Sequence, residues 1–368
     1  MMKLGAAALS SLLLLIGCIS PDIRQPVSLV QSCPGLTSDI QRLAEERQFP
    51  GIAVAVVGPT GAIWSYAVGV GDLETGAPIN PAKTLFRIGS TSKALSAYAL
   101  QRLASDGLVN LDAPIGDTVS ELPEAYRKLT LRQLAGHLGG VRHYKGEAEL
   151  SSTTTYPTAA DALPLFINDP LVTEPGAQFH YSTYSYTLIT AVLERQTGKP
   201  FLQLMDEVLR PLGTASIRAD TLAVQPPLRT QYYYLDEGKY VIGPWVDSSY
   251  KWAGGGMLAS VADLARFGHA HFALGAEERA ELWTRQRTAD GNPTNYGMGW
   301  FVRDGYVEHP GGSLGGTTLL RVYPAEEVSV ALAANLSFMR DDAFGDLPDR
   351  LAQCFSSSGG VAGLKLAD

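Results

Sequence analysis

The strand-like segments of this chain gather near its two ends, and this arrangement limits the possible fold more than any other feature. Residues 52–57 and 62–68 are apolar and are separated by a Gly-Pro-Thr-Gly turn, which predicts a hairpin. Further strands are predicted over residues 299–303, 306–309, 317–323 and 328–334. Between the two groups, from Ser90 to about Ala289, the spacing of apolar residues is mostly helical.

Strands grouped in this way do not alternate with helices, which argues against a βαβ fold. We expect an α+β fold in which strands from both ends form one antiparallel sheet, and in which the helical insert, about residues 90–290, forms a second lobe. Helices over residues 36–48 and 342–355 are expected to pack on one face of the sheet. The insert is expected to hold helices over residues 92–106, 130–137, 159–167, 184–197, 201–210, 260–273 and 276–286.

The N-terminus has the features of an export signal. Lys3 is followed by an apolar run from Ala6 to Ile16, which is too short to span a bilayer but fits a signal peptide over residues 1–17. Leu-Ile-Gly-Cys18 resembles a bacterial lipobox, in which Cys18 would become the lipidated first residue. A plain signal peptide cut slightly later, or a buried N-terminal helix, is the alternative. We therefore expect a protein of the bacterial cell envelope that faces the periplasm or the exterior.

The segments on either side of the predicted main domain, residues 36–355, differ from it in composition. Residues 18–35 contain three prolines and scattered polar groups, which is typical of a tether, and residues 356–368 form a Ser- and Gly-rich tail that we expect to be mobile. Cys33 and Cys354 remain as two thiols in an oxidising compartment. They suggest one disulfide, although two buried free thiols would explain them as well.

The overall composition excludes some functions. Of the 368 residues, 45% are hydrophobic and 18% are charged, so the chain can bury a large core and is not disordered. The net charge is −8, and no basic cluster interrupts the acidic balance. A nucleic-acid-binding protein would show a basic face, so that class is not expected.

Ser90 and Lys93 are the first candidates for chemistry. They lie three residues apart at the start of a predicted helix, so they would share one face of its first turn. A serine hydroxyl needs a nearby base, and a lysine in a dry pocket beside other cations can have a lowered pKa and serve as one. The simpler alternative is that Ser90 caps the helix and Lys93 is solvated. A second S-x-x-K, from Ser248 to Lys251, lies in loop-like sequence with no helix expected to carry it.

Two further stretches carry candidate groups. Tyr181-Ser-Thr183 comes just before a predicted helix, where a tyrosine near a cationic lysine could ionise more easily and transfer protons. His309-Pro-Gly311-Gly312 precedes the strand over 317–323, where glycines would let a substrate approach the backbone and His309 could supply a donor or a positive charge. Tyr181 could instead be a packing residue, and His309 a surface residue in a tight turn.

Two other patterns are weaker. The sequence from Gly311 to Gly315 fits the G-x-S-x-G nucleophile elbow around Ser313, but a strand rather than a helix follows it, and all six histidines precede Ser313. His269 and His271 lie two apart on a predicted helix and face different ways, with no acidic or cysteine cluster nearby. No metal site is therefore expected.

Together, three stretches at family spacing resemble the serine β-lactamase and penicillin-binding-protein superfamily, on its class C and esterase-like side. They are Ser90-Thr-Ser-Lys93, Tyr181-Ser-Thr183 and His309-Pro-Gly311, supported by the stretches 130–137, 254–264 and 296–300. Residues 137–144 and 181–188 are most similar to the mitochondrial serine β-lactamase-like proteins. The resemblance covers about residues 36–355.

The resemblance implies a mechanism. Ser90 would attack a carbonyl and form an acyl-enzyme, Lys93 and Tyr181 would share the role of base, and Tyr181 would activate the deacylating water. Backbone N–H groups of Ser90 and Gly312 would form the oxyanion hole, and His309 would take the place of the third motif's lysine. Neither a metal nor an organic cofactor is implied.

Two positions depart from the β-lactamase pattern. The second motif commonly ends in Asn, which contacts the substrate's acyl amide, whereas this chain has Thr183. The third commonly has a central hydroxyl for the substrate carboxylate, whereas this chain has Pro310. Both changes weaken recognition of penicillin-like or D-Ala-D-Ala ends, so the expected substrate is a small peptide, amide or ester. The alternatives are a D,D-carboxypeptidase, a true β-lactamase, or a non-catalytic envelope protein that uses the same cleft for binding or assembly. The oligomeric state stays open.

Overall fold

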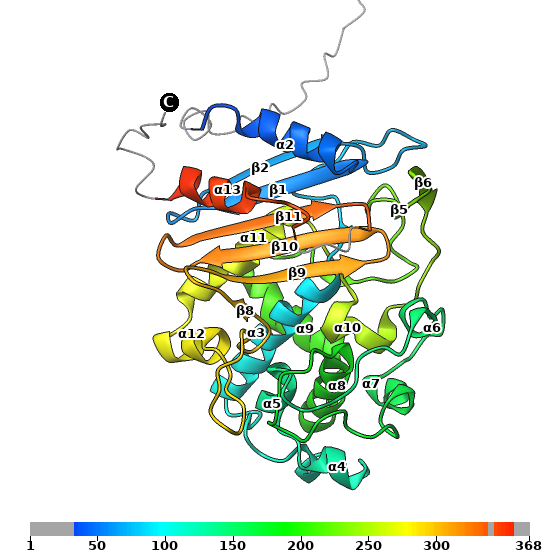
Figure 1. Cartoon of the computed structure of the whole chain (residues 1–368), viewed down its shortest axis with the longest axis vertical. Coiled ribbons are helices and arrows are strands. Elements are labelled where there is room, and N and C mark those ends of the chain that lie inside the picture. Colours follow the sequence, from blue (N-terminus) through cyan, green and yellow to red (C-terminus); the bar gives the residue numbers. More distant parts are fainter. Residues whose placement is uncertain (1–32, 338–341, 357–368) are drawn as a thin grey trace, which may run out of the picture.

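The computed structural model describes residues 33–337 and 342–356. The predicted signal peptide, the lipidation site Cys18, most of the tether and all but the first residue of the tail lie outside the described residues. The architecture is α+β, as predicted: an antiparallel sheet with two helices on one face and a helical lobe on the other (Figure 1). In the described part of the chain, no helix is long and apolar enough to cross a membrane.

Strands from both ends of the chain form one six-stranded sheet. Its order is β2-β1-β11-β10-β9-β8, and every neighbouring pair is antiparallel. The strands are β1 (Gly51–Val57), β2 (Ile63–Gly69), β8 (Phe301–Val302), β9 (Val307–Ser313), β10 (Gly316–Tyr323) and β11 (Val328–Ala334). The pairing of β1 with β11 joins the two ends, with Ile52 opposite Ala334.

The sheet is buried on both faces, which explains why β1 is apolar at every position and β11 at every position except Ser329, rather than at alternate ones. Successive side chains of a strand point to opposite faces. In β1, Ile52, Val54 and Val56 pack against α2 (Leu36–Glu46) and α13 (Leu347–Phe355), whereas Ala53, Ala55 and Val57 face the helical lobe. The domain therefore has two cores separated by the sheet.

Small residues bring the helical lobe close to the sheet. Helix α11 (Val261–Ala270) packs on β1 and β11, where Ala331 and Ala333 face it. A Cβ on Gly268 of this helix would lie 2.0 Å from Ser329 Oγ of β11. A larger side chain there would push the helix off the sheet.

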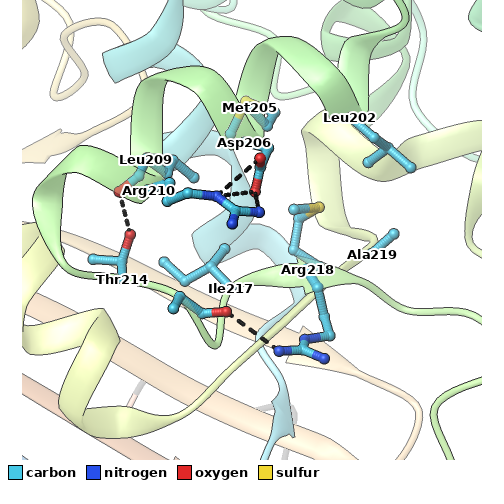
Figure 2. Close-up of a pocket in the computed structure, with 11 residues that line it drawn as sticks. Leu202, Met205, Asp206, Leu209, Arg210, Thr214, Ile217, Arg218 and Ala219 are labelled. Carbon is cyan, nitrogen blue, oxygen red and sulfur yellow. Dashed lines mark hydrogen bonds and ion pairs between the residues drawn. The ribbon is translucent and has the colours of Figure 1, made fainter.

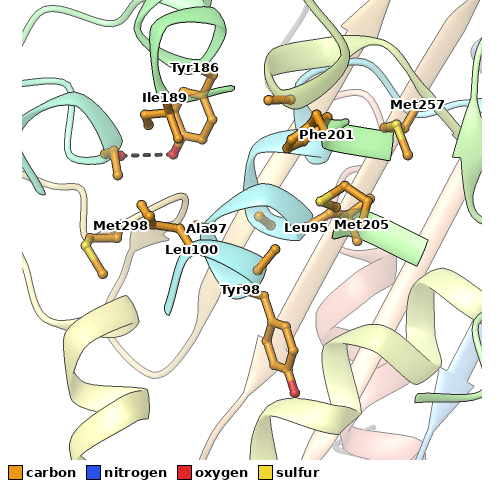
Figure 3. Close-up of a cluster of buried hydrophobic side chains, with 14 of the residues drawn as sticks. Leu95, Ala97, Tyr98, Leu100, Tyr186, Ile189, Phe201, Met205, Met257 and Met298 are labelled. Atoms are coloured by element: carbon orange, nitrogen blue, oxygen red, sulfur yellow. Dashed lines mark hydrogen bonds between the residues drawn. The ribbon is translucent and has the colours of Figure 1, made fainter. Parts of the chain in front are cut away.

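The helical lobe is built around α3 (Ser92–Ser105), which is buried on almost every side. Side chains of α8, α9 and β7 belong to the same buried cluster as Leu95 and Leu100 (Figure 3), whereas Tyr98 packs edge-on against Phe267 and His271. The remaining helices are α4 (Glu124–Arg127), α5 (Leu131–Ala135), α6 (Glu147–Leu150), α7 (Ala159–Ala162), α8 (Thr183–Thr197), α9 (Phe201–Leu209), α10 (Trp252–Gly255) and α12 (Ala276–Trp283). Ser92 and Lys93 in the first turn of α3 are fully buried, so this turn is held away from water.

The prediction of an all-helical insert was wrong in detail. A small sheet runs in the order β3-β7-β4, and β5 and β6 form a separate hairpin. These strands are β3 (Phe86–Arg87), β4 (Arg218–Ala219), β5 (Tyr233–Asp236), β6 (Lys239–Ile242) and β7 (Met257–Ala259). Segments of two to four residues are too short to show a period of two, so pairing with distant segments decides their conformation.

The first and last described helices, α2 and α13, lie on the face of the sheet away from the helical lobe. A disulfide joins Cys33 to Cys354, with their Cα atoms 5.9 Å apart. It links the segment before α2 to α13, two helices that share one hydrophobic core. The closing helix starts at Leu347 rather than near 342, because residues 342–346 form turns.

Candidate active site

Ser90 lies in a 3₁₀ turn, Gly89–Thr91, immediately before α3, and Lys93 lies in the first turn of that helix. Lys93 Nζ is 3.2 Å from Ser90 Oγ, so the predicted shared face exists. The capping alternative for Ser90 is not supported, because Ser92 Oγ donates to the Gly89 carbonyl at 2.7 Å and the N-cap position, Thr91, makes no side-chain cap.

Glycines in β9 let this strand lie against the Ser90 turn. A Cβ on Gly311 would lie 2.0 Å from the Ile88 carbonyl oxygen. Gly89, whose φ is +49°, faces Gly312 so closely that a Cβ there would lie 2.6 Å from the Gly312 carbonyl oxygen. The sequence suggested that these glycines make room for substrate. In the structure they make room for the nucleophile's own turn, which places the Gly312 backbone beside Ser90.

Lys93 is fully buried and is surrounded by neutral acceptors. Besides Ser90 Oγ, its Nζ contacts Thr183 Oγ1 at 3.2 Å and the Gly254 carbonyl oxygen at 2.5 Å. None of these partners is a carboxylate. Burial therefore holds the pKa of Lys93 well below 10.5, and the positive charge of Lys251 lowers it further. A neutral Lys93 has a lone pair that can accept the Ser90 proton.

Tyr181 lies just before α8, whose N-cap is Ser182; the Ser182 side chain accepts from Ser185 N. Two histidines hold this loop. His137 Nδ1 accepts from Ser182 N and His143 Nδ1 accepts from Thr183 N, each at 3.2 Å. Burial lowers the pKa of both, to about 4 for His143, so both rings stay neutral acceptors near neutral pH.

The Tyr181 hydroxyl is hydrogen-bonded to Ser90, and Lys93 Nζ lies 4.8 Å from the centre of its ring. Burial raises the pKa of Tyr181 above its usual value of 10, and the hydrogen bond to Ser90 offsets only part of that rise. Tyr181 is therefore a phenol at rest. The expectation that a cationic lysine would favour its phenolate was wrong, because burial raises the pKa of Tyr181 and also holds the pKa of Lys93 well below its usual value.

His309 is not a surface residue in a turn. It is buried in β9, which continues through Pro310 and the two glycines to Ser313. Its Nδ1 contacts the Pro310 carbonyl oxygen at 2.7 Å and must carry the hydrogen, so Nε2 accepts from the Tyr296 hydroxyl at 2.9 Å. Burial lowers the pKa of His309 to about 3. Of the two roles predicted for His309, a donor or a positive charge, the positive charge was therefore wrong.

Thr183 contributes to the site through Lys93. Its side chain is 2% exposed and its hydroxyl receives the Lys93 hydrogen bond. A Cβ on Gly254 would lie 2.6 Å from Thr183 Cγ2, so α10 and α8 pack tightly on either side of the lysine. Thr183 therefore helps to hold Lys93 in place through this hydrogen bond, in the absence of any substrate.

The second S-x-x-K is not in a loop, as the sequence suggested. Residues Ser249–Lys251 form a 3₁₀ turn that leads into α10, and both Ser248 and Lys251 are buried. Ser248 Oγ donates to Asp220 Oδ2 at 3.4 Å rather than to Lys251. It therefore lacks the paired base of Ser90.

At Ser313, strand β10 follows the G-x-S-x-G sequence, as predicted.

Some positioning groups escaped the sequence analysis. Gly254 acts through its carbonyl oxygen, which no motif reports, and Tyr296 is one of 16 tyrosines. His137 and His143 lie in a stretch that the family resemblance already included. Among the described residues, no group of three or more His, Cys, Asp or Glu side chains is arranged to hold a metal ion.

A separate cavity of about 240 Å³ lies between α9 and β4, and no candidate catalytic residue lines it. Leu202, Met205 and Ile217 form much of its wall, and Arg210 pairs with Asp206 at its edge (Figure 2). It contains no nucleophile–base pair like Ser90 and Lys93.

Comparison with known proteins agrees with this geometry. The family model described as Beta-lactamase matches residues 36–353. This chain belongs to the β-lactamase family. It is similar to the human mitochondrial serine β-lactamase-like protein LACTB, with 27% identity over 78% of this chain and 71% of the relative. It is also similar to the Escherichia coli K12 D-alanyl-D-alanine-carboxypeptidase/endopeptidase AmpH, with 22% identity over 73% and 75%.

A solved structure entitled SurE has the same fold. It superimposes with a TM-score of 0.71 at 25% identity and covers 92% of this chain and 79% of its own. The family therefore has bacterial and mitochondrial members.

Proposed function

We propose that this protein is a serine hydrolase that forms an acyl-enzyme on Ser90 and hydrolyses an amide, peptide or ester bond. The observation that carries the proposal is the contact between Ser90 Oγ and Lys93 Nζ, in a site where the lysine is buried without a carboxylate. Such a lysine is a base at neutral pH, which is what an alcohol nucleophile needs.

In acylation, Ser90 Oγ bonds to the substrate carbonyl carbon and its proton passes to Lys93 Nζ. The carbonyl oxygen becomes an oxyanion that the backbone N–H groups of Ser90 and Gly312 stabilise; one such donor typically contributes about 3–4 kcal/mol to the transition state. The bond to the leaving group then breaks, and the leaving group takes a proton from the Tyr181 hydroxyl. The proton on Lys93 restores Tyr181, so both groups return to their resting forms.

Deacylation reverses these roles. Water bonds to the carbonyl carbon of the Ser90 ester, and one of its protons passes to Lys93 or Tyr181. The ester bond to Ser90 Oγ then breaks, and Ser90 Oγ takes this proton back from the protonated base. The products are a carboxylic acid and free Ser90. Because its pKa is raised, Tyr181 keeps its proton at rest and cannot accept another. The lowered pKa of Lys93 favours the amine with a free lone pair, so Lys93 is the first proton acceptor.

The substrate class follows from what surrounds the nucleophile. Thr183 is occupied by Lys93, and Pro310 offers no hydroxyl, so a β-lactam has fewer partners here than in the usual motifs. We propose a small peptide, amide or ester as the substrate. The name of the relative AmpH favours a D,D-carboxypeptidase as the second candidate. Release of D-Ala from a muropeptide would support it, and rapid opening of nitrocefin would support a β-lactamase.

The proposal is tested by labelling the soluble form, residues 19–368, with a serine-reactive phosphonate and mapping the adduct by mass spectrometry. We expect an adduct on Ser90, lost in Ser90→Ala and slowed in Lys93→Met. Ser248→Ala is the matched control, because it removes the serine of the other S-x-x-K. A folded protein that is not labelled, or is labelled at Ser248 or Ser313, would contradict the mechanism and favour a non-catalytic binding protein.

We also propose that the protein is exported and anchored by a lipid on Cys18 to a bacterial membrane, with the active site in the envelope. The lipobox-like sequence is the basis of this proposal. Metabolic labelling with a tagged fatty acid should mark the wild type and not Cys18→Ser. Equal labelling of both, or processing at another residue, would refute the anchor and leave the hydrolase proposal untouched.

A further inference from the structure

Lys251 lies three residues before Gly254, on the same short segment, and Gly254 is one of the groups that hold Lys93. Lys251 ends the 3₁₀ turn before α10, and Gly254 of α10 accepts the hydrogen bond from Lys93. Two buried hydroxyls fix this segment: Thr187 Oγ1 donates to the Tyr250 carbonyl at 2.8 Å, and Ser96 Oγ donates to the Ala253 carbonyl at 2.9 Å. Lys251 is therefore held at a defined position in the wall of the site.

The Lys251 side chain is largely buried, and its ammonium has no polar partner among the described residues. The residue is only 6% exposed, and within residues 33–337 and 342–356 its Nζ makes no hydrogen bond or ion pair. It lies 5.1 Å from the ring centre of Tyr250 and 5.9 Å from that of Tyr144. Burying an unpaired cation is unfavourable, so a group that pairs with it is expected when the site is filled.

The nearest acidic group is already committed to other partners. Asp220 pairs with Arg87 at 2.5 Å and accepts from the Tyr232 hydroxyl at 3.2 Å and from Ser248 at 3.4 Å. Arg87 and Asp220 cancel each other's charge, so the charge of Lys251 stays uncompensated. The fold itself does not supply the anion.

Lys251 is linked to the group that holds Lys93 through one tyrosine. Tyr144, which lies against its ammonium, is hydrogen-bonded through its side chain to Thr183, and Thr183 holds Lys93. The charge of Lys251 lowers the pKa of both Lys93 and His143, which places it within electrostatic range of both. An anion bound to Lys251 would therefore lie within electrostatic range of Lys93.

We propose that Lys251, flanked by the rings of Tyr144 and Tyr250, binds a carboxylate of the substrate. The proposal rests on the serine hydrolase function and narrows its substrate class to molecules that carry a free carboxylate in addition to the bond that is cleaved. A charged hydrogen bond made in a buried site discriminates strongly against a neutral analogue, because the analogue leaves the cation unpaired.

The test compares matched esters that differ only in charge. Mono-p-nitrophenyl adipate and p-nitrophenyl hexanoate differ at the far end of the acyl chain, and 4-carboxyphenyl and 4-carbamoylphenyl hexanoate differ in the leaving group. We expect the wild type to have a higher kcat/KM for the ester that carries the carboxylate than for its neutral partner in at least one of the two pairs. The preference is measured as the ratio of these two kcat/KM values. Lys251→Met should reduce that ratio about tenfold or more, the range of a charged hydrogen bond, and Lys251→Arg should retain most of it. Lys83→Met, which removes an exposed lysine, is the matched control.

The outcomes separate this proposal from the function on which it rests. Failure of the phosphonate to label wild-type Ser90 would remove the hydrolase itself. Labelling of Ser90 together with equal kcat/KM within both ester pairs would overturn the carboxylate site alone. If Lys251→Met slows charged and neutral esters equally and moves the pH–rate profile to higher pH, Lys251 only tunes Lys93, and the proposal is wrong. Circular dichroism and phosphonate labelling verify that each variant is folded.

Discussion

Replacing Lys251 with methionine should make the protein more stable, although it removes a charged side chain from a buried position. Burial lowers the pKa of Lys251 from 10.5 to about 8, with the charge of Arg87 as a further cause and Asp220 opposing both. Each unit of pKa shift corresponds to about 1.4 kcal/mol. The protonated lysine therefore destabilises the fold by about 3 kcal/mol at neutral pH.

The structure indicates what the substitution would lose. Lys251 Nζ makes no hydrogen bond within the described residues, so methionine leaves no acceptor unsatisfied. Only the contacts with the rings of Tyr144 and Tyr250 are lost, and these stabilise the fold by about 0.5–2 kcal/mol. We expect a net gain of about 1–3 kcal/mol in the free energy of unfolding at pH 7.

The sign of the pH dependence follows from the direction of the shift. The folded-state pKa is below the unfolded one, so between about pH 8 and 10.5 the unfolded chain binds more protons, and wild-type stability rises with pH. Below pH 8 the full difference between Lys251→Met and the wild type should be present. It should shrink through this window and disappear above it.

Urea denaturation of both proteins at pH 6.5, 7.5, 8.5 and 9.5 measures this difference, with Lys83→Met as an exposed-lysine control. A variant that is less stable than the wild type at pH 7, by an amount that does not change with pH, would refute the reasoning. It would mean that Lys251 has a compensating partner in solution, and it would remove the argument for an incoming carboxylate.

Three further changes should separate catalysis from stability. Lys93→Met should lower kcat/KM for esters about 10²- to 10⁴-fold, the usual range for a lost general base. In the wild type, the rate should rise with pH as Lys93 deprotonates, at a pH below its ordinary pKa of 10.5. A variant with normal rates would exclude Lys93 as the base. Serines at both Cys33 and Cys354 should lower the free energy of unfolding by about 2–5 kcal/mol, because the bridge spans 321 residues, and should leave ester turnover at 25 °C unchanged; equal denaturation midpoints would show that the bridge is not formed. Gly311→Ala should destabilise the protein by about 1–3 kcal/mol and reduce turnover, because its Cβ would lie 2.0 Å from a backbone oxygen; a normal melting temperature would contradict the close approach of β9.

The main sheet and the long helices could be predicted because their segments are long enough to carry a pattern. Strand β11 was predicted over residues 328–334, the bounds that it has, and α8 begins one residue earlier than expected. Strand β9 was predicted to stop at His309, because Pro310 and the glycines that follow are poor strand residues. It continues because β10 pairs with it throughout, whereas β8 covers only its first two residues.

The motifs identified the site, but the sequence could not give the state of its groups. The contact between Ser90 and Lys93 follows from helix geometry, which is local. The neutrality of His309 depends on Tyr296 and on burial beneath the lobe, and the position of Lys251 depends on a turn of only three residues among glycines. These properties arise from contacts between distant segments, which no local pattern records.

The identity of the base follows from the charges around the nucleophile rather than from the motifs. Each group that contacts Lys93 is neutral, and so are His137, His143 and His309 near pH 7 because burial lowers the pKa of each. A phenolate at Tyr181 would need a cation beside it, and the amine within reach is the one whose pKa is held down. If Lys93 were protonated, Tyr181 could ionise, but Lys251 opposes that protonation. Lys93 can therefore remain a base because burial lowers its pKa and the positive charge of Lys251 lowers it further, and Lys251 is then available to bind an anion.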